Sequence, residues 1–222
     1  MKRGILSCDV LSLFDVICYI VETAHTLGMQ IVLYDEGMYP SGSACGMVVK
    51  TNPEFAAHGI TITDSVDYGE VVAKLDCGKY IVYKKTNGTL RGIHFGQDDG
   101  EEDVPPAADI LNEDAVDLFI RLTHDEYYKR LKKYFGNTII GFFTDEPSCV
   151  GRGDGWKFRP WYKGALSDLS DMGGKPEELS ALFDNQTNET TIIYRKLISE
   201  KLNDTYYKKL YNWCEEHNIA LM

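Results

Sequence analysis

The chain contains Ile31-Val32-Leu33-Tyr34-Asp35-Glu36-Gly37 and, further on, Ile139-Ile140-Gly141-Phe142-Phe143-Thr144-Asp145-Glu146-Pro147, and these two stretches decide the fold that the sequence predicts. Each is a short apolar run that ends in Asp-Glu and is followed at once by glycine or proline. A continuous apolar run of this length is typical of a buried parallel strand. Acids at the carboxyl end of such strands lie where α/β barrels build their active sites. The two stretches therefore predict carboxylates that converge on one pocket.

Helical patterns surround the two apolar runs. Apolar residues recur at helical spacing within residues 14–24, and Gly28 supplies the end of that helix. Asn112 is typical of an N-cap, and the amphipathic pattern of residues 113–135 predicts one long helix. A further helix is predicted from about residue 190 to 217. Helices that alternate with short apolar strands predict an α/β fold with a parallel sheet.

The middle of the chain has a different, β-rich character. Residues 70–75 and 79–84 read as strands, and Asp76-Cys77-Gly78 reads as the turn between them, which predicts an antiparallel insertion. The expected fold is thus α/β: a partial (β/α)8 TIM barrel with a small antiparallel β insertion. The predicted divisions are barrel βα units over residues 1–59, the β-rich insertion over 60–104, and further barrel units, truncated at the C-terminus, over 105–222.

The predicted barrel is incomplete. The sequence holds about three βα units, whereas a closed barrel has eight. Its last residues, Asn218-Ile219-Ala220-Leu221-Met222, read as the first half of another buried strand. We therefore expect a fragment of a larger barrel enzyme, with the missing remainder of the barrel as a partner. The alternative is a truncated product without independent function, prone to aggregate through an exposed strand edge.

Composition excludes some classes of protein. The 222 residues are 44% hydrophobic, which is enough for a substantial core, and the formal net charge is −11. A nucleic-acid binder normally shows a basic patch, but the one dense basic run, from Lys129 to Lys133, reads as a solvated helix face. No apolar run approaches the ~18 residues of a membrane span, and no secretory signal follows Met1. We expect a cytoplasmic protein with no nucleic-acid or membrane partner.

The candidate catalytic acids are Asp35, Glu36, Asp145 and Glu146. Because side chains alternate along a strand, one of Asp35 and Glu36 should point into the pocket. Pro147 favours an extended backbone at Glu146, which would fix that carboxylate at the strand tip. A glycosidase acid needs a raised pKa, and a nearby Asp145 would supply the negative charge that raises it. The alternative is that these acids cap loops or pair with Lys and Arg.

Two aromatic residues are candidate sugar contacts. Tyr39 begins a segment of small residues that would let a ligand approach the backbone. Trp156 lies in the loop after the second strand, although aromatics there would equally fill a satellite core. His124 falls within a helical pattern and is interpreted as structural. No cofactor is expected, and a Ca²⁺ site among the acids is the less favoured alternative.

The two decisive stretches resemble a known family. Leu33-Tyr34-Asp35-Glu36-Gly37-Met38-Tyr39-Pro40-Ser41-Gly42-Ser43-Ala44-Cys45-Gly46-Met47-Val48 is similar to the Y-D-E-x-x-x-P-S-G-x-A-x-G-x-V stretch of large bacterial glycosyl hydrolases. These resemble glycoside hydrolase family 106, the α-L-rhamnosidase-like group, whose second hallmark is similar to Ile140–Pro147. The resemblance implies a TIM-barrel catalytic domain that acts on plant or microbial glycans, in chains that continue into β-sandwich domains.

The sequence therefore predicts a glycosidase, a hydrolase of carbohydrate metabolism that acts through paired carboxylates. Glu146 is the favoured acid/base, and Asp35 or Glu36 is the second carboxylate, with Asp145 beside Glu146. The predicted substrate contacts are Tyr34, Tyr39 and Trp156. Carboxyl groups about 5 Å apart would give retention, and a separation of about 6.5–9.5 Å would give inversion. The alternative function is a non-catalytic carbohydrate-binding remnant.

Overall fold

A computed structural model describes residues 10–66, 69–91 and 104–222 of the chain. The elements, in chain order, are α1 (Val10–Thr26), β1 (Ile31–Tyr34), α2 (Met47–Thr51), η1 (Pro53–Phe55), β2 (His58–Thr63), β3 (Glu70–Lys74), β4 (Tyr80–Lys85), α3 (Glu113–Leu122), α4 (His124–Leu131), η2 (Lys132–Tyr134), β5 (Ile139–Phe143), η3 (Gly153–Lys157), β6 (Arg159–Pro160), α5 (Ala165–Asp171), η4 (Pro176–Leu182), α6 (Glu189–Leu202), η5 (Asn203–Tyr207), α7 (Lys208–Glu216) and β7 (Ala220–Leu221).

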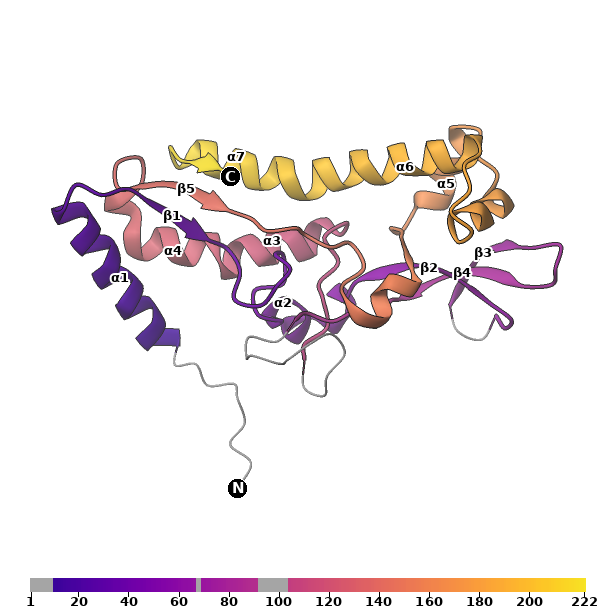
Figure 1. Cartoon of the computed structure of the whole chain (residues 1–222), viewed down its shortest axis with the longest axis horizontal. Helices are drawn as coiled ribbons and strands as arrows, with labels where there is room; N and C mark the ends of the chain where they lie inside the picture. The colour runs from indigo at the N-terminus through magenta and orange to yellow at the C-terminus, as the bar shows by residue number, and fades with distance from the viewer. Residues whose placement is uncertain (1–9, 67–68, 92–103) are drawn as a thin grey trace, which may run out of the picture.

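A three-stranded parallel sheet lies at one end of the elongated molecule, in the order β1-β5-β7 (Figure 1). Leu33 pairs with Phe142, and Tyr34 pairs with Phe143. One face of this sheet packs on helices, and Leu33 and Phe142 join a buried cluster with Val21 of α1, Leu131 of α4 and Trp213 of α7. The apolar runs therefore form the parallel strands that their pattern predicts.

The other face of the parallel sheet is less covered. Val32 and Tyr34 of β1 are 42% and 41% exposed, and Phe143 of β5 is 42% exposed, whereas Phe142 is fully buried. The pleat explains this difference, because successive side chains along a strand point to opposite faces. The described helices thus bury one face of the sheet more than the other.

A second sheet occupies the other end of the molecule, in the order β3-β4-β2-β6 (Figure 1). All of its pairings are antiparallel. The hairpin of β3 and β4 is closed by the predicted turn at residues 76–78, and Leu75 N–H donates to the Lys79 carbonyl across it. Ile60 and Ile81 are fully buried in this sheet against Leu169 and Leu179.

The expected partial TIM barrel is wrong. A barrel sheet is built of parallel strands joined by crossover helices. Among the described residues, three strands form a parallel sheet, and the other four form a separate antiparallel sheet. A short turn joins β3 to β4 and places them side by side in opposite directions, whereas β2 pairs with β4 and with the distant β6. The fold is α/β, with one small parallel sheet and one antiparallel sheet.

Long helices connect the two ends of the molecule. α6, η5 and α7 form a continuous rod along one side (Figure 1). The rod has a π-helical segment at Asn203–Tyr207, where Tyr206 is fully buried against Phe119 of α3. The single helix predicted over 113–135 is instead divided at Thr123 into α3 and α4. This division places His124 at the first position of α4.

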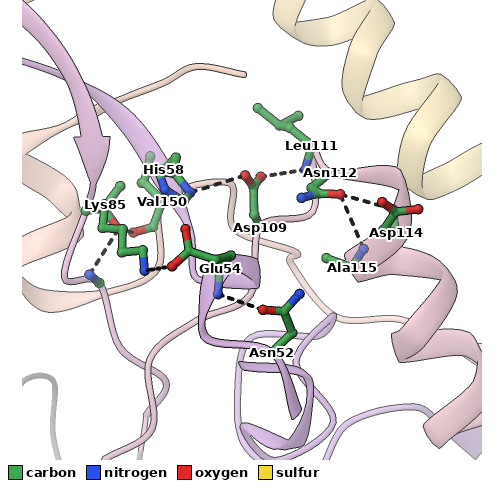
Figure 2. A network of polar contacts seen from close by, with 12 residues as sticks. Asn52, Glu54, His58, Lys85, Asp109, Leu111, Asn112, Asp114, Ala115 and Val150 are labelled. Carbon is green, nitrogen blue, oxygen red and sulfur yellow. Dashed lines mark hydrogen bonds and ion pairs between the residues drawn. The ribbon is translucent and has the colours of Figure 1, made fainter. Parts of the chain in front are cut away.

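A polar network joins the antiparallel sheet to α3 (Figure 2). Asp109 is 4% exposed, lies 3.6 Å from Nδ1 of His58, and accepts a hydrogen bond from the Leu111 N–H. Burial raises the pKa of Asp109, and the hydrogen bond from His58 opposes that rise. Asn112 then caps α3 by accepting from the N–H groups of Asp114 and Ala115. The cap predicted from sequence is therefore present.

Asn112→Ala should lower the free energy of unfolding by about 1 kcal/mol, because the first turn of α3 loses its side-chain acceptor. Urea denaturation followed by circular dichroism measures this. Asn112→Asp is the matched control, since it keeps an acceptor at the N-cap and should stay within about 0.5 kcal/mol of the unmodified chain. An equal loss in both variants would show that the cap bond is not what stabilises α3.

Two predictions fall partly outside the described residues: the absence of a secretory signal at the N-terminus, which concerns residues 1–9, and the β-rich insertion over 60–104, of which residues 67–68 and 92–103 are not described. In the described part of the chain, no helix combines the length and the apolar character that crossing a bilayer requires.

Candidate carboxylate site at the ends of β1 and β5

The ends of β1 and β5 bring the two Asp-Glu pairs side by side. Tyr34 pairs with Phe143 in parallel register, and the Asp35 N–H donates to the Phe143 carbonyl at 3.2 Å. The carboxyl ends of parallel strands lie at the same edge of a sheet, so the residues that follow them are neighbours. The two strand ends therefore lie side by side, as the two apolar runs predict, and their convergence on a pocket stays a prediction.

The hydroxyl of Tyr34 connects acids from the two strands. Its oxygen lies 3.0 Å from Oε2 of Glu36 and 2.6 Å from Oδ2 of Asp145. A phenol has one hydrogen to donate. Tyr34 can therefore donate to only one of the two carboxyl groups at a time. At the other contact, the carboxyl group must itself carry a proton, because otherwise a lone pair of the phenol would face a lone pair of the carboxylate.

The surroundings of Glu36 favour its uncharged form. Burial raises the pKa of Glu36, and the charge of Asp145 adds to the rise, while the Tyr34 hydrogen bond and Arg91 oppose it. The shorter of the two Tyr34 contacts is the one with Asp145. Burial, followed by these two acids, also raises the pKa of Tyr34 well above its ordinary value, which keeps the phenol protonated.

Glu146 belongs to a second contact, with Tyr39. The Tyr39 hydroxyl donates to Oε2 of Glu146, and this bond is the first cause of the raised pKa of Tyr39. The guanidinium groups of Arg91 and Arg152 lie 5.4 Å and 5.1 Å from the centre of the Tyr39 ring. Arg152 also lies 5.4 Å from the ring of Trp156, so it connects the two aromatics predicted to contact sugar.

Trp156 is 61% exposed, and its ring is therefore open to a ligand. The other aromatics of its loop differ from it, because Phe158, Trp161 and Tyr162 are all buried. Phe158, Trp161 and Tyr162 therefore pack in the core, and the role of Trp156 as a sugar contact stays a prediction.

The backbone of Glu146 differs from the prediction. Proline at 147 favours an extended residue before it, but Glu146 has a φ of +39°. A positive φ is uncommon for a residue with a Cβ and is found at functional sites held by their surroundings. Here the contact with Tyr39 and the Ser41–Asp145 hydrogen bonds hold the segment.

Asp35 lies beneath the site rather than in it. Its side chain is 2% exposed, and Oδ1 accepts a hydrogen bond from the Ser41 hydroxyl at 2.7 Å. Burial raises the pKa of Asp35 to about 7, although the hydrogen bond from Ser41 and the nearby Thr144 hydroxyl lower it. Of the two acids that end β1, Glu36 therefore faces the open side and Asp35 faces the interior.

His124 is the residue that sequence-based reasoning interpreted as structural but that the fold places beside Asp35. Its Nε2 atom lies 3.9 Å from Oδ2 of Asp35, and neither side chain is exposed. Burial lowers the pKa of His124 to about 3. No local pattern pointed to this pair, because Asp35 and His124 are far apart in sequence and meet only through β1 and α4.

The Ca²⁺ alternative has no support in the described residues. No group of three or more His, Cys, Asp or Glu side chains in residues 10–66, 69–91 and 104–222 is arranged to hold a metal ion.

Comparisons with family models, curated proteins and solved structures found no match to this chain. The resemblance of residues 33–48 and 140–147 to family 106 glycosidases therefore stays a prediction, and function must be argued from the site itself.

Proposed function

We propose that the chain hydrolyses glycosides at the ends of β1 and β5, with Glu36 as the general acid/base and Asp145 as the nucleophile. The observation that carries this proposal is the Tyr34 hydroxyl between the two acids, 3.0 Å from Glu36 and 2.6 Å from Asp145. Glycoside hydrolysis needs one protonated and one ionised carboxyl group. The raised pKa of Glu36 and the short bond from Tyr34 to Asp145 support that division.

The distance between the acids favours retention of configuration. Both carboxylate oxygens contact one hydroxyl oxygen, so they lie within about 6 Å of each other. Retaining glycosidases hold their carboxyl groups about 5–5.5 Å apart, whereas inverting enzymes leave about 6.5–9.5 Å for a water molecule. Glu146, which the sequence favoured as acid/base, takes a substrate-positioning role beside Tyr39 in this proposal, and Trp156 offers an exposed ring for stacking.

A carbohydrate-binding protein without catalysis is the second candidate function. The exposure of Trp156 favours it, because an exposed aromatic beside polar groups is sufficient to hold a sugar ring. Hydrolysis requires Glu36 and Asp145 to act together on the glycosidic bond, whereas sugar binding does not. Activity assays on variants of these residues therefore distinguish the two functions.

The test is hydrolysis of a panel of nitrophenyl glycosides that includes the α-L-rhamnoside, by the unmodified chain and by Asp145→Asn. We expect turnover of at least one glycoside, release of the product with its original anomeric configuration by NMR, and a loss of at least about 10²-fold in kcat in Asp145→Asn. Glu70→Gln, which changes an exposed acid on β3, is the control and should be fully active.

A chain that is folded by circular dichroism but hydrolyses nothing on the panel contradicts the enzyme proposal. Calorimetric binding of a sugar by that inactive chain, lost in Trp156→Ala, would support the carbohydrate-binding function. Product with inverted configuration would contradict the assignment of Asp145 as nucleophile.

A further inference from the structure

Three buried polar atoms beneath the carboxylate site have no hydrogen-bond partner: Oδ2 of Asp35 and both ring nitrogens of His124. His124 is fully buried among apolar rings, with centroid distances of 4.3 Å to Phe142, 5.2 Å to Trp213 and 5.4 Å to Phe119. Unsatisfied polar groups in such a place are costly, and each one calls for an explanation.

We propose that Asp35 and His124 are a buried acid–base pair that positions the carboxylate site from below: Asp35 holds Ser41, and Ser41 holds the end of β5 that carries Asp145 and Glu146. This inference deepens the proposed function and rests on it only in naming Asp145 as the nucleophile and Glu146 as a substrate-positioning residue.

The first link runs from Asp35 to the end of β5. Ser41 donates its hydroxyl hydrogen to Asp35 Oδ1 at 2.7 Å, and the same hydroxyl oxygen accepts from the Asp145 N–H at 2.9 Å. The Ser41 N–H in turn donates to the Asp145 carbonyl at 3.1 Å. Ser41 is thus hydrogen-bonded to Asp145 in both directions, and its hydroxyl keeps its orientation only while Asp35 accepts from it.

The second link runs from Asp35 to His124. A separation of 3.9 Å is too long for a hydrogen bond. If the two side chains moved about 1 Å closer, a proton on Asp35 Oδ2 could be donated to an unprotonated Nε2 of His124. This hydrogen bond would give a partner to two of the three unpartnered atoms. Oδ1 would still accept from Ser41. With the proton on Oδ2, Asp35 would therefore hold Ser41 through Oδ1 and a neutral His124 through Oδ2 at the same time.

The surroundings favour this uncharged form. The titratable groups that face Asp35 are Glu36, Asp145, Tyr127 of α4, Tyr206 of η5 and Cys214 of α7. His217 faces His124. The two carboxylates repel an ionised Asp35, and His217 opposes a charged His124. None of these groups supplies a cation that would stabilise the Asp35 carboxylate.

Asparagine is the natural mimic of a protonated aspartic acid, because it offers an acceptor to Ser41 and a donor to His124. We therefore compare Asp35→Asn with Asp35→Leu, which has neither group, and follow amide hydrogen exchange at Asp145 by NMR. Asp35→Leu should accelerate that exchange at least tenfold relative to the amides of β4, and Asp35→Asn should not. Unchanged exchange in Asp35→Leu overturns the positioning role.

If Asp35→Leu does not fold, Ser41→Ala provides the same readout, because it removes the acceptor of the Asp145 N–H and leaves the buried pair intact. Accelerated exchange at Asp145 in Ser41→Ala is expected, and unchanged exchange overturns the inference.

The protonation state is measured separately with ¹⁵N-labelled histidine, and His124→Gln assigns the signals. We expect a neutral His124 ring with its hydrogen on Nδ1 over the whole range from about pH 8 to 4.5. A ring that titrates near the ordinary histidine pKa of about 6.5, or that carries its hydrogen on Nε2, contradicts the pair as described.

These measurements use no substrate, so failure of the proposed function leaves them interpretable. If the chain does hydrolyse glycosides, Asp35→Leu should lower kcat at least tenfold and Asp35→Asn should restore it. An active chain in which both variants keep full kcat would contradict the inference while leaving the proposed function in place.

Discussion

Phe142→Ala should lower the free energy of unfolding by about 3–5 kcal/mol, which is the usual cost of removing a buried phenyl ring. Phe142 is fully buried in β5, with ring centroids 4.3 Å from His124, 5.4 Å from Tyr127 and 5.7 Å from Trp213. The contacts come from α4 and α7, so the mutation opens a cavity between the sheet and the helices that cover it. Urea denaturation followed by fluorescence measures the effect.

The neighbouring residue is the matched control. Phe143→Ala removes the same atoms from the opposite face of the same strand, where the ring is 42% exposed and contacts Tyr34 at 5.3 Å. We expect a loss of about 1 kcal/mol or less. Equal losses at the two positions would show that both faces of the parallel sheet are covered, against the fold described here.

The second large effect is on the pH dependence of stability. Burial raises the pKa of Asp35 to about 7 and lowers that of His124 to about 3. The ordinary values, near 4 and 6.5, apply to the unfolded chain. Between about pH 4 and 6.5 the unfolded pair holds its proton on His124 and the folded pair holds it on Asp35. Both states then bind one proton, and the pair contributes no slope to stability in this range.

Replacing one member of the pair at a time should reveal the separate contribution of each to the pH dependence of the free energy of unfolding, and the two contributions have opposite signs. In Asp35→Asn only His124 remains, and the unfolded state binds more protons than the folded state below pH 6.5. Stability should therefore fall as the pH is lowered from about 6.5 toward 3, by up to about 1.4 kcal/mol per pH unit relative to the unmodified chain.

In His124→Gln only Asp35 remains, and the folded state binds more protons than the unfolded state between about pH 4 and 7. Stability should fall as the pH rises through that range, with a similar slope of opposite sign. Denaturant titrations at four or five pH values measure the slope of the free energy of unfolding against pH for each variant. Slopes of the same sign in the two variants, or no difference from the unmodified chain, would contradict the burial-driven transfer of the proton.

Local sequence patterns predicted the strands and the meeting of their acids, but not the fold as a whole. The apolar runs at 31–34 and 139–143 form parallel strands because both are short, apolar and bounded by turn residues. Closure into a barrel depends on pairing along the entire chain, which no local pattern reports. The antiparallel pairing of β3 with β4 was predicted from the turn at residues 76–78, but the pairing of β2 with the distant β6 was not.

Within the site, three features could not be predicted because they depend on contacts between segments that are far apart in the sequence. Alternation along β1 showed that Asp35 and Glu36 point to different sides, but only the packing of α4 shows that Asp35 is the inner one. The positive φ of Glu146 overrides the preference that Pro147 imposes. His124 acquires its partner only because the helix predicted over 113–135 divides at Thr123 and starts again at His124.

The most direct test of the proposed mechanism compares Glu36→Gln with Glu70→Gln on two glycosides of the same sugar, one with a nitrophenyl leaving group and one with an unactivated alcohol. A general acid contributes about 10²–10⁴-fold, and an unactivated leaving group depends on it far more than nitrophenol does. We predict that Glu36→Gln loses at least about 10²-fold in kcat/KM on the unactivated glycoside and much less on the nitrophenyl glycoside, while Glu70→Gln retains both activities. Equal losses on the two substrates, or full activity in Glu36→Gln, would contradict the assignment of Glu36 as the acid.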